Sequence, residues 1–80
     1  MNNHYYKGPT RIIYNNLTQE IIDYKHQIMM NEWRLLVLKN NRNMDHKQWV
    51  RRMAIIHNII NDLRYRIKIL KEKRIIISCG

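Results

Sequence analysis

The chain has 80 residues, a formal net charge of +9 and a hydrophobic fraction of 45%. This length allows one domain at most, and the apolar fraction excludes disorder throughout the chain. The charge favours an anionic partner such as nucleic acid or an acidic protein surface, and Cys79, the only cysteine, leaves no partner for an internal disulfide.

Cysteine usage and the first residues predict a soluble intracellular protein. A lone thiol next to the end of the chain fits a reducing compartment better than a secreted setting. The opening MNNHYYKGPTR lacks the apolar core of a secretory signal, and no apolar run approaches the length that crosses a bilayer. We therefore expect the cytoplasm, an organelle matrix or the interior of a host cell.

Residues 1–16 are expected to form an extended N-terminal arm. A Gly-Pro pair interrupts regular structure, and the apolar residues within 11–14 favour an extended backbone. Asn16, with Gln19 three residues later, is a variant of the capping box and marks the start of a helix.

A helix is predicted from about residue 17 to 39, because polar and apolar side chains recur at steps of three and four. Its polar face is formed by Glu20, Asp23, Gln27, Asn31 and Arg34. Its apolar face is formed by Leu17, Ile21, Tyr24, Ile28 and Leu35, joined by Ile22, Met29, Trp33 and Leu36. Trp33 is expected to anchor the core near the end of this helix.

The Asn-rich segment 40–45 separates two helices, and Asp45 followed by Gln48 is a second capping signature. The second helix is predicted from about residue 46 to 73. Its apolar residues alternate steps of four and three: Trp49, Met53, Ile56, Ile60, Leu63, Ile67 and Leu70. Such an unbroken stripe is typical of a coiled-coil seam, and Trp49 is expected to be a second core anchor.

The predicted fold is all-α, an antiparallel two-helix hairpin, because a short connection folds two long helices back on each other. The hairpin domain spans residues 17–74. Residues 75–80 are expected to form a short β-like C-terminal tail, since residues 75–77 are β-branched. This tail emerges where residues 11–14 enter, so the two segments are candidates for a small antiparallel ribbon, within one chain or between two.

The two helices carry more apolar surface than one seam can bury. Four residues that lie off the central seam are candidates for a protein interface: Met30, Val37, Ile55 and Ile59. Apolar residues on a second face need a second contact. We therefore expect two hairpins to complete a four-helix bundle, as a homodimer or larger assembly, or each hairpin to dock on a larger partner.

Positive charge is concentrated in the second helix, which has a large excess of Lys and Arg over Asp62 and Glu72. Eight bases are candidates for contacts to RNA or DNA phosphates: Lys47, Arg51, Arg52, Arg64, Arg66, Lys68, Lys71 and Lys73. Trp49 and Tyr65 lie near enough in the chain to stack on bases, which predicts a binding edge with little sequence specificity. The alternative interpretation is a solvated helix face with an excess of base.

Two short segments suggest one concrete form of the RNA-binding hypothesis. The first helix opens with LTQE, and the second contains IHNIINDLR. Together they resemble the small two-helix ribosomal protein family beside the peptide exit tunnel of the large subunit, over residues 17 to about 74. The resemblance implies a hairpin that binds ribosomal RNA. His57 and Asn58 stand where that family usually has Ala and Arg, and the Gly between its helices is absent here.

Catalytic, metal and cofactor sites are not expected. No two of the four His stand three or four residues apart, so His26 and His57 are expected to be interior or boundary residues. The two Gly, at positions 8 and 80, form no phosphate loop, and Cys79 has no activating context. Membrane-surface binding by a basic amphipathic helix is a minor alternative.

The sequence therefore predicts a non-enzymatic binding protein that contacts RNA or DNA phosphates through its second helix. The alternative is a protein-interaction module, such as a viral, phage or organellar assembly subunit, which docks through exposed Ile and Met side chains. In that case the bases would steer the module to an acidic partner.

Overall fold

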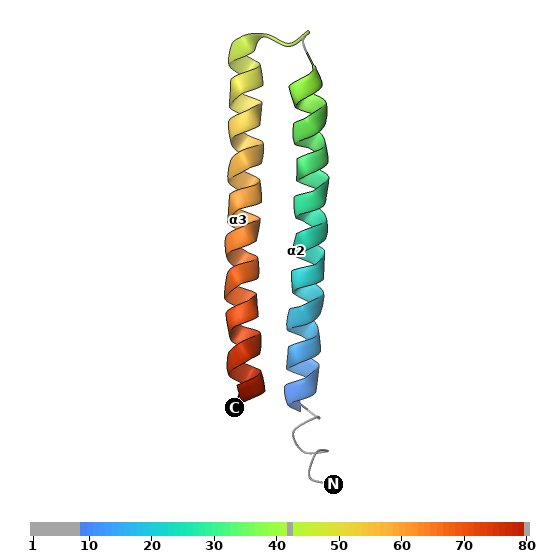
Figure 1. The fold of residues 1–80 in the computed structure, drawn as a ribbon, viewed down its shortest axis with the longest axis vertical. Helices are drawn as coiled ribbons and strands as arrows, with labels where there is room; N and C mark the ends of the chain where they lie inside the picture. The colour runs from blue at the N-terminus through green and yellow to red at the C-terminus, as the bar shows by residue number, and fades with distance from the viewer. Residues whose placement is uncertain (1–8, 42, 80) are drawn as a thin grey trace.

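The computed structural model describes residues 9–41 and 43–79, which form an antiparallel pair of long helices (Figure 1). Helix α2 spans Pro9–Asn40 and helix α3 spans His46–Cys79. The start of α2 and the end of α3 lie at one end of the pair, which we call the open end, and the connection lies at the other. The predicted all-α hairpin is confirmed for this part of the chain.

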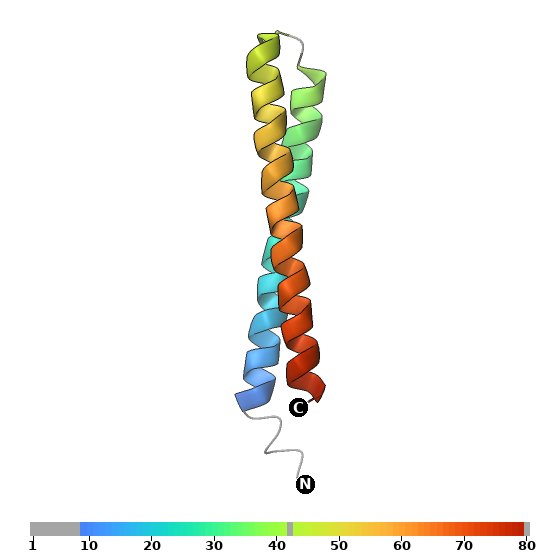
Figure 2. The same ribbon diagram turned by 90° about the vertical axis from the view of Figure 1, so that its left-hand side faces the viewer.

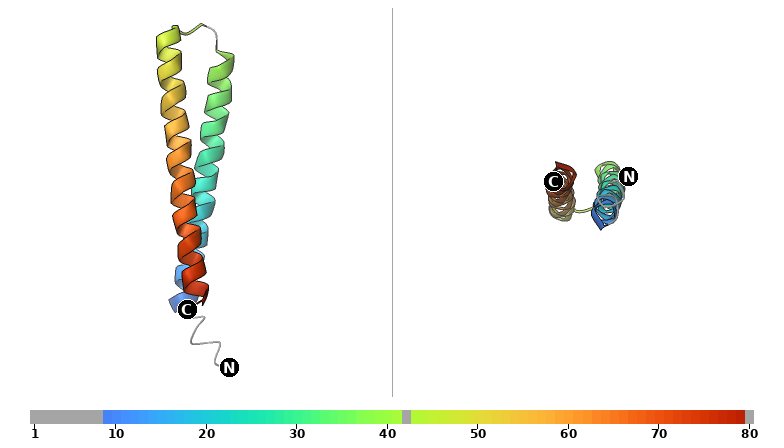
Figure 3. Two further views of the ribbon diagram at one scale, coloured as in Figure 1. Left: turned by 60° about the vertical axis from the view of Figure 1, so that its left-hand side comes forward. Right: turned by 90° about the horizontal axis from the view of Figure 1, so that it is seen from below.

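The hairpin is a rod only two helices thick. Its Cα atoms extend 15 × 12 Å across the long axis, and the end-on view in Figure 3 shows two columns side by side. In Figure 2, α3 crosses in front of α2 at a shallow angle and follows it from end to end. Neither helix, over the residues described, has a stretch apolar and long enough to span a membrane. The seam between the helices is therefore where apolar side chains can be buried.

The predicted stripe of α3 forms its side of this seam. The buried residues of α3 are Ile60, Leu63, Ile67 and Leu70, and the other stripe members are half-buried. The central cluster joins Ile21 of α2 to Ile67 and Leu70, with Leu17, Tyr24 and Ile28 packed around it. The alternating steps of four and three thus predicted the contact face of α3 correctly.

The seam of α2 differs from its predicted apolar face: it includes Asn31 and Leu38, and it excludes the exposed residues Ile22, Met29, Trp33 and Leu36. The assignment of Asn31 to the polar face is wrong, because this side chain is buried, with 8% of its surface exposed. Its Nδ2 donates a hydrogen bond to the carbonyl oxygen of Gln27 at 2.8 Å. The α2 seam therefore runs through Leu17, Ile21, Tyr24, Ile28, Asn31, Leu35 and Leu38. A polar residue in such a seam lowers stability but specifies the register of the two helices.

The predicted extended arm is wrong for residues 9–16, which form the first turns of α2. Proline suits the first position of a helix, because its missing N–H would be unpaired there and its φ is already helical. The Thr18 hydroxyl donates to the carbonyl oxygen of Tyr14 at 3.0 Å, within the same helix. The remainder of the predicted arm, residues 1–8, lies outside the described residues.

The predicted β-like tail is also wrong, because α3 continues to Cys79. Ile77 is half-buried, so the seam extends into the last turns of the helix. Contact with a neighbouring helix overrides the weak preference of β-branched residues for strands. Since residues 11–14 and 75–77 are both helical, the ribbon predicted between them does not form. The last residue of the predicted tail, at position 80, lies outside the described residues.

Trp49 ties the connection end of the hairpin together. Its indole Nε1 donates a hydrogen bond to the carbonyl oxygen of Leu38 at 2.8 Å. Its ring also stacks on His46, with the ring centroids 6.2 Å apart. Trp49 is half-buried and lies outside the buried core, and the prediction of Trp33 as a core anchor is wrong, because Trp33 is 63% exposed.

Candidate interaction surfaces

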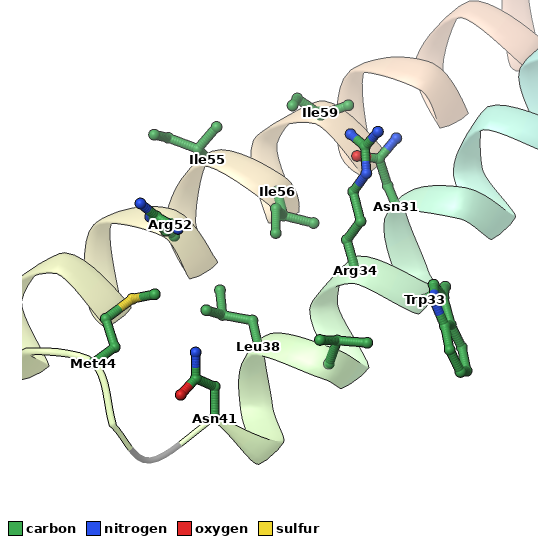
Figure 4. Close-up of a pocket in the computed structure, with 11 residues that line it drawn as sticks. Asn31, Trp33, Arg34, Leu38, Asn41, Met44, Arg52, Ile55, Ile56 and Ile59 are labelled. Atoms are coloured by element: carbon green, nitrogen blue, oxygen red, sulfur yellow. The ribbon is translucent and has the colours of Figure 1, made fainter.

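An open groove of about 560 Å³ lies between the helices in the half of the hairpin near the connection (Figure 4). Its apolar lining comes from both helices: Val37, Leu38, Ile55, Ile56 and Ile59. Leu38 and Ile56 belong to the seam, whereas the other three lie beside it and are well exposed. The groove is therefore an unfilled continuation of the seam on one flank of the hairpin.

Helical spacing explains why these side chains meet. Side chains three or four residues apart share a face of a helix. Arg34 and Val37 follow such a step on α2, and Arg52, Ile55 and Ile59 follow such steps on α3. In an antiparallel pair, the positions that border the seam on one flank of each helix face each other. The sequence spacing and the antiparallel direction together create the groove.

Two arginines make the edge of the groove basic. In Figure 4, Arg34 reaches from α2 toward α3, and Arg52 projects from α3. Within the described part of the chain, neither guanidinium lies within ion-pair distance of a carboxylate. Trp33 also borders the groove, but its indole points away from the other lining residues. The groove thus combines an apolar floor with uncompensated positive charge.

The structure brings three of the four predicted interface residues into this groove: Val37, Ile55 and Ile59. Their exposed fractions are 52, 57 and 40%. Met30 does not line the groove, although it lies one heptad before Val37 on the same face of α2 and is 46% exposed. The predicted residues therefore cluster, but Met30 extends the apolar surface beyond the groove.

The eight bases predicted to contact phosphates are all exposed, but they do not form a single edge of α3. Arg64, Lys68 and Lys71 follow steps of four and three and therefore share one face. Arg66 and Lys73, seven residues apart, share another face. The remaining three, Lys47, Arg51 and Arg52, lie near the connection, and Arg52 belongs to the groove.

Two of these bases have carboxylate partners. Arg64 donates from Nη2 to Oε2 of Glu32 on α2 at 3.5 Å, and Nε of Arg66 lies 3.2 Å from Oδ2 of Asp62. The guanidinium of Arg66 also lies over the ring of Tyr24, 6.0 Å from its centroid. Tyr24 and then Asp62 raise the pKa of Arg66 above its ordinary value, so this side chain stays charged.

Lys68 and Lys71 differ from those arginines, since no carboxylate of the described residues lies within ion-pair distance of either. With Arg64 they border a shallow depression that Ile67, Glu72 and Ile75 also line. We call this face the lysine face.

Sequence reasoning missed Arg74 as a member of the seam. It follows Leu70 by four residues, so the step pattern contained the signal. Its guanidinium lies over the ring of Tyr14, 5.4 Å from the centroid, and Nη1 donates to Oγ1 of Thr18 at 3.1 Å. Its buried Nε has no hydrogen-bond partner among the described residues. Arg74 therefore joins the helices at the open end.

The side chains that commonly bind metals or take part in catalysis, namely His, Cys, Asp and Glu, do not gather in one place in the described part of the chain. Among residues 9–41 and 43–79, no three His, Cys, Asp or Glu side chains gather at a possible metal site. His26 and His57 are exposed, so their prediction as interior or boundary residues is wrong, and Cys79 is an exposed free thiol. Among known proteins, no family model, no curated sequence and no solved structure matches this chain.

Proposed function

We propose that this protein is a non-enzymatic assembly module whose groove binds an amphipathic helix of another protein. The observation that supports the proposal best is the convergence of Val37, Ile55 and Ile59, from two helices, on one open groove. Each of these side chains is at least 40% exposed. Covering them with a further helix removes apolar surface from water and stabilises the complex.

The charge at the edge of the groove indicates the chemistry of the partner. Arg34 and Arg52 come from opposite helices, and neither pairs with a carboxylate in the described part of the chain. Asp or Glu residues beside the apolar stripe of a bound helix would face these two bases. A helix with apolar residues at steps of three and four and acidic flanks fits both features. Such a helix would complete the hairpin as part of a larger helical bundle.

A labelled synthetic helix tests this proposal. The probe is an amphipathic peptide with Leu at steps of three and four and Glu on both flanks, titrated with the full-length protein by fluorescence anisotropy. Binding should saturate, and Ile55→Asp and Ile59→Asp should each weaken it at least tenfold. Ile75→Asp is the matched control, because Ile75 is also exposed on α3 but lies outside the groove. Equal losses for Ile55→Asp and Ile75→Asp would refute the proposal.

The lysine face favours a second candidate function, the binding of RNA or DNA through phosphates. Lys68 and Lys71 share this face with Arg64 and have no carboxylate partner among the described residues. Lysines in this arrangement contact phosphates without reading the base sequence. The ribosomal type of RNA binding is one form of this candidate. It ranks second because the remaining bases lie on other faces of α3.

A further inference from the structure

Helix α2 carries a second apolar stripe on the face away from α3. This outer stripe consists of Ile22, Met29, Trp33 and Leu36, whose exposed fractions are 51, 58, 63 and 51%. His26, also exposed, completes its steps of four and three. With 3.6 residues per turn, the centre of the outer stripe lies about 150° around the helix from the centre of the seam. Helix α3 therefore cannot cover it.

We infer that a second copy of this chain packs on the outer stripe, with its own α2 antiparallel to the first. The stripe is nearly self-complementary about Met29, because Ile22 and Leu36 lie seven residues to either side, and His26 and Trp33 lie three residues before and four residues after it. With Met29 beside Met29 of the second copy, Ile22 lies level with Leu36, and His26 lies within one residue, about 1.5 Å, of the level of Trp33. A two-fold contact between identical chains requires this kind of self-complementarity.

The charges beside the outer stripe have a matching symmetry. Lys25 and Glu32 border the same side of the stripe, since they are seven residues apart on α2. In the antiparallel register, Lys25 of each copy lies within one residue, about 1.5 Å, of the level of Glu32 of the other, on the same side of the contact, so the two-fold axis creates two ion pairs. A parallel two-fold arrangement would instead place this flank of one copy against the opposite flank of the other, so Lys25 and Glu32 would form no such ion pairs. Charge complementarity therefore favours a second copy in the antiparallel direction.

An existing contact of Glu32 is compatible with this arrangement. Glu32 accepts a hydrogen bond from Arg64 of its own chain through Oε2 at 3.5 Å. Both side chains are more than half exposed, so the contact leaves the carboxylate open to solvent and to a second base. Oε1 of Glu32 can accept from Lys25 of the second copy while Oε2 keeps Arg64.

This inference rests on the proposal that the hairpin is an assembly module, but it concerns a different surface. The groove and the outer stripe share only Trp33, whose indole points away from the groove lining (Figure 4). A chain that binds the acidic peptide and yet remains a monomer would overturn this inference alone. A dimer that fails to bind the peptide would overturn only the role of the groove.

Sedimentation equilibrium of the full-length chain gives the first test. The wild type should be a dimer, and Met29→Glu should raise the dissociation constant at least about 100-fold, because the two-fold axis brings two like charges together. Ile55→Glu is the matched control and should leave the dimer intact, while circular dichroism verifies the helix content of both variants. A monomeric wild type, or a dimer insensitive to Met29→Glu, would overturn the inference.

A charge exchange tests the pairing of Lys25 with Glu32. Lys25→Glu and Glu32→Lys should each weaken the dimer, and the double variant should restore it, because each acid again meets a base of the other copy. The two positions are about 10 Å apart along one helix, so restoration within a single chain is not expected. A double variant as weak as the single variants would contradict the pairing.

Cysteine cross-linking tests the direction of the second copy. In a Cys79→Ser background, oxidation of a mixture of Ile22→Cys and Leu36→Cys chains should give the mixed disulfide dimer. Either variant alone should cross-link poorly, because in the antiparallel dimer its two thiols are about 21 Å apart, far beyond disulfide reach. Efficient cross-linking of each variant alone, without the mixed product, would show a parallel dimer and overturn the inference.

Discussion

The indole Nε1 of Trp49 donates a hydrogen bond to the carbonyl oxygen of Leu38 at 2.8 Å, joining the first turn of α3 to the last turns of α2. The same carbonyl oxygen accepts from the backbone N–H of Asn41 at 3.1 Å, so the indole adds a second donor, from the opposite helix, to a carbonyl at the end of α2. The connection between the helices is thereby closed by a side chain, in addition to the short backbone contacts of the loop itself.

Replacement of Trp49 tests the strength of this closure. Trp49→Phe keeps an aromatic ring but removes the N–H donor, and should lower the free energy of unfolding by about 0.5–1.5 kcal/mol, measured by urea denaturation. Tyr65→Phe is the control, because Tyr65 is 60% exposed and donates no hydrogen bond seen among the described residues. Equal effects of the two substitutions would show that the bond to Leu38 adds nothing to stability.

Asn31 should limit the stability of the seam. Asn31→Leu replaces a buried amide by an apolar side chain, and should raise the free energy of unfolding by roughly 1 kcal/mol. For a chain of this size that corresponds to an increase of about 4–8 °C in Tm. Thermal unfolding followed by circular dichroism measures the change, with the exposed Gln27→Leu as control. A lower Tm for Asn31→Leu would mean that the hydrogen bond to Gln27 outweighs the cost of burial.

Arg74 should be replaceable by an apolar residue of similar length. Its buried Nε has no partner in the described part of the chain, and such an unsatisfied donor costs about 1–3 kcal/mol. Arg74→Met should therefore leave the free energy of unfolding unchanged or raise it, in spite of the lost contacts to Tyr14 and Thr18. The neighbouring exposed Lys73→Met controls for the change in net charge. A loss above about 2 kcal/mol for Arg74→Met alone would show that those contacts dominate.

The lysine face makes a separate prediction about nucleic acid. If Lys68 and Lys71 contact phosphates, Lys68→Glu with Lys71→Glu should weaken binding of a mixed-sequence oligonucleotide, and should reduce the log–log salt slope by about two. Lys47→Glu with Arg51→Glu changes the net charge equally, at the other end of α3. Titrations at two salt concentrations compare the double variants. Equal losses would indicate attraction to net charge rather than contact by this face.

Much of the fold was predictable from the spacing of apolar residues, because burial between two helices requires steps of three and four. That requirement identifies the α3 seam, including Ile60 and Leu63, from the amino-acid sequence alone. Asn31 escaped the same reasoning, since its amide is satisfied by the carbonyl of Gln27 in its own helix and so tolerates burial. Polarity alone does not reveal that such a local partner exists.

The helix ends were harder to predict because local preference and tertiary contact disagree there. Residues 11–14 and 75–77 favour strands locally, yet they are helical where the two helices lie against each other at the open end. Arg74 bridges the helices in this region through Tyr14 and Thr18, and an arginine is easily overlooked in an apolar stripe.

The candidate surfaces were predictable as residues but not as an arrangement. Val37, Ile55 and Ile59 are recognisable as apolar residues off the seam, but their meeting in one groove depends on how the helices align. Likewise, a count of bases in α3 predicts an anionic partner without assigning faces. Arg64 and Arg66 are only two residues apart, but they lie on different faces of α3 because of the helical twist.

The two indoles of this protein stand in unlike surroundings, and that difference supplies an intrinsic optical reporter. Trp49 is half-sheltered and hydrogen-bonded, so its emission should follow the integrity of the hairpin itself. Trp33 projects into water, so its quenching by acrylamide should fall when another molecule settles over that side of α2. With Trp49→Phe and Trp33→Phe used in turn, unfolding and association can be read as separate fluorescence signals without any added dye.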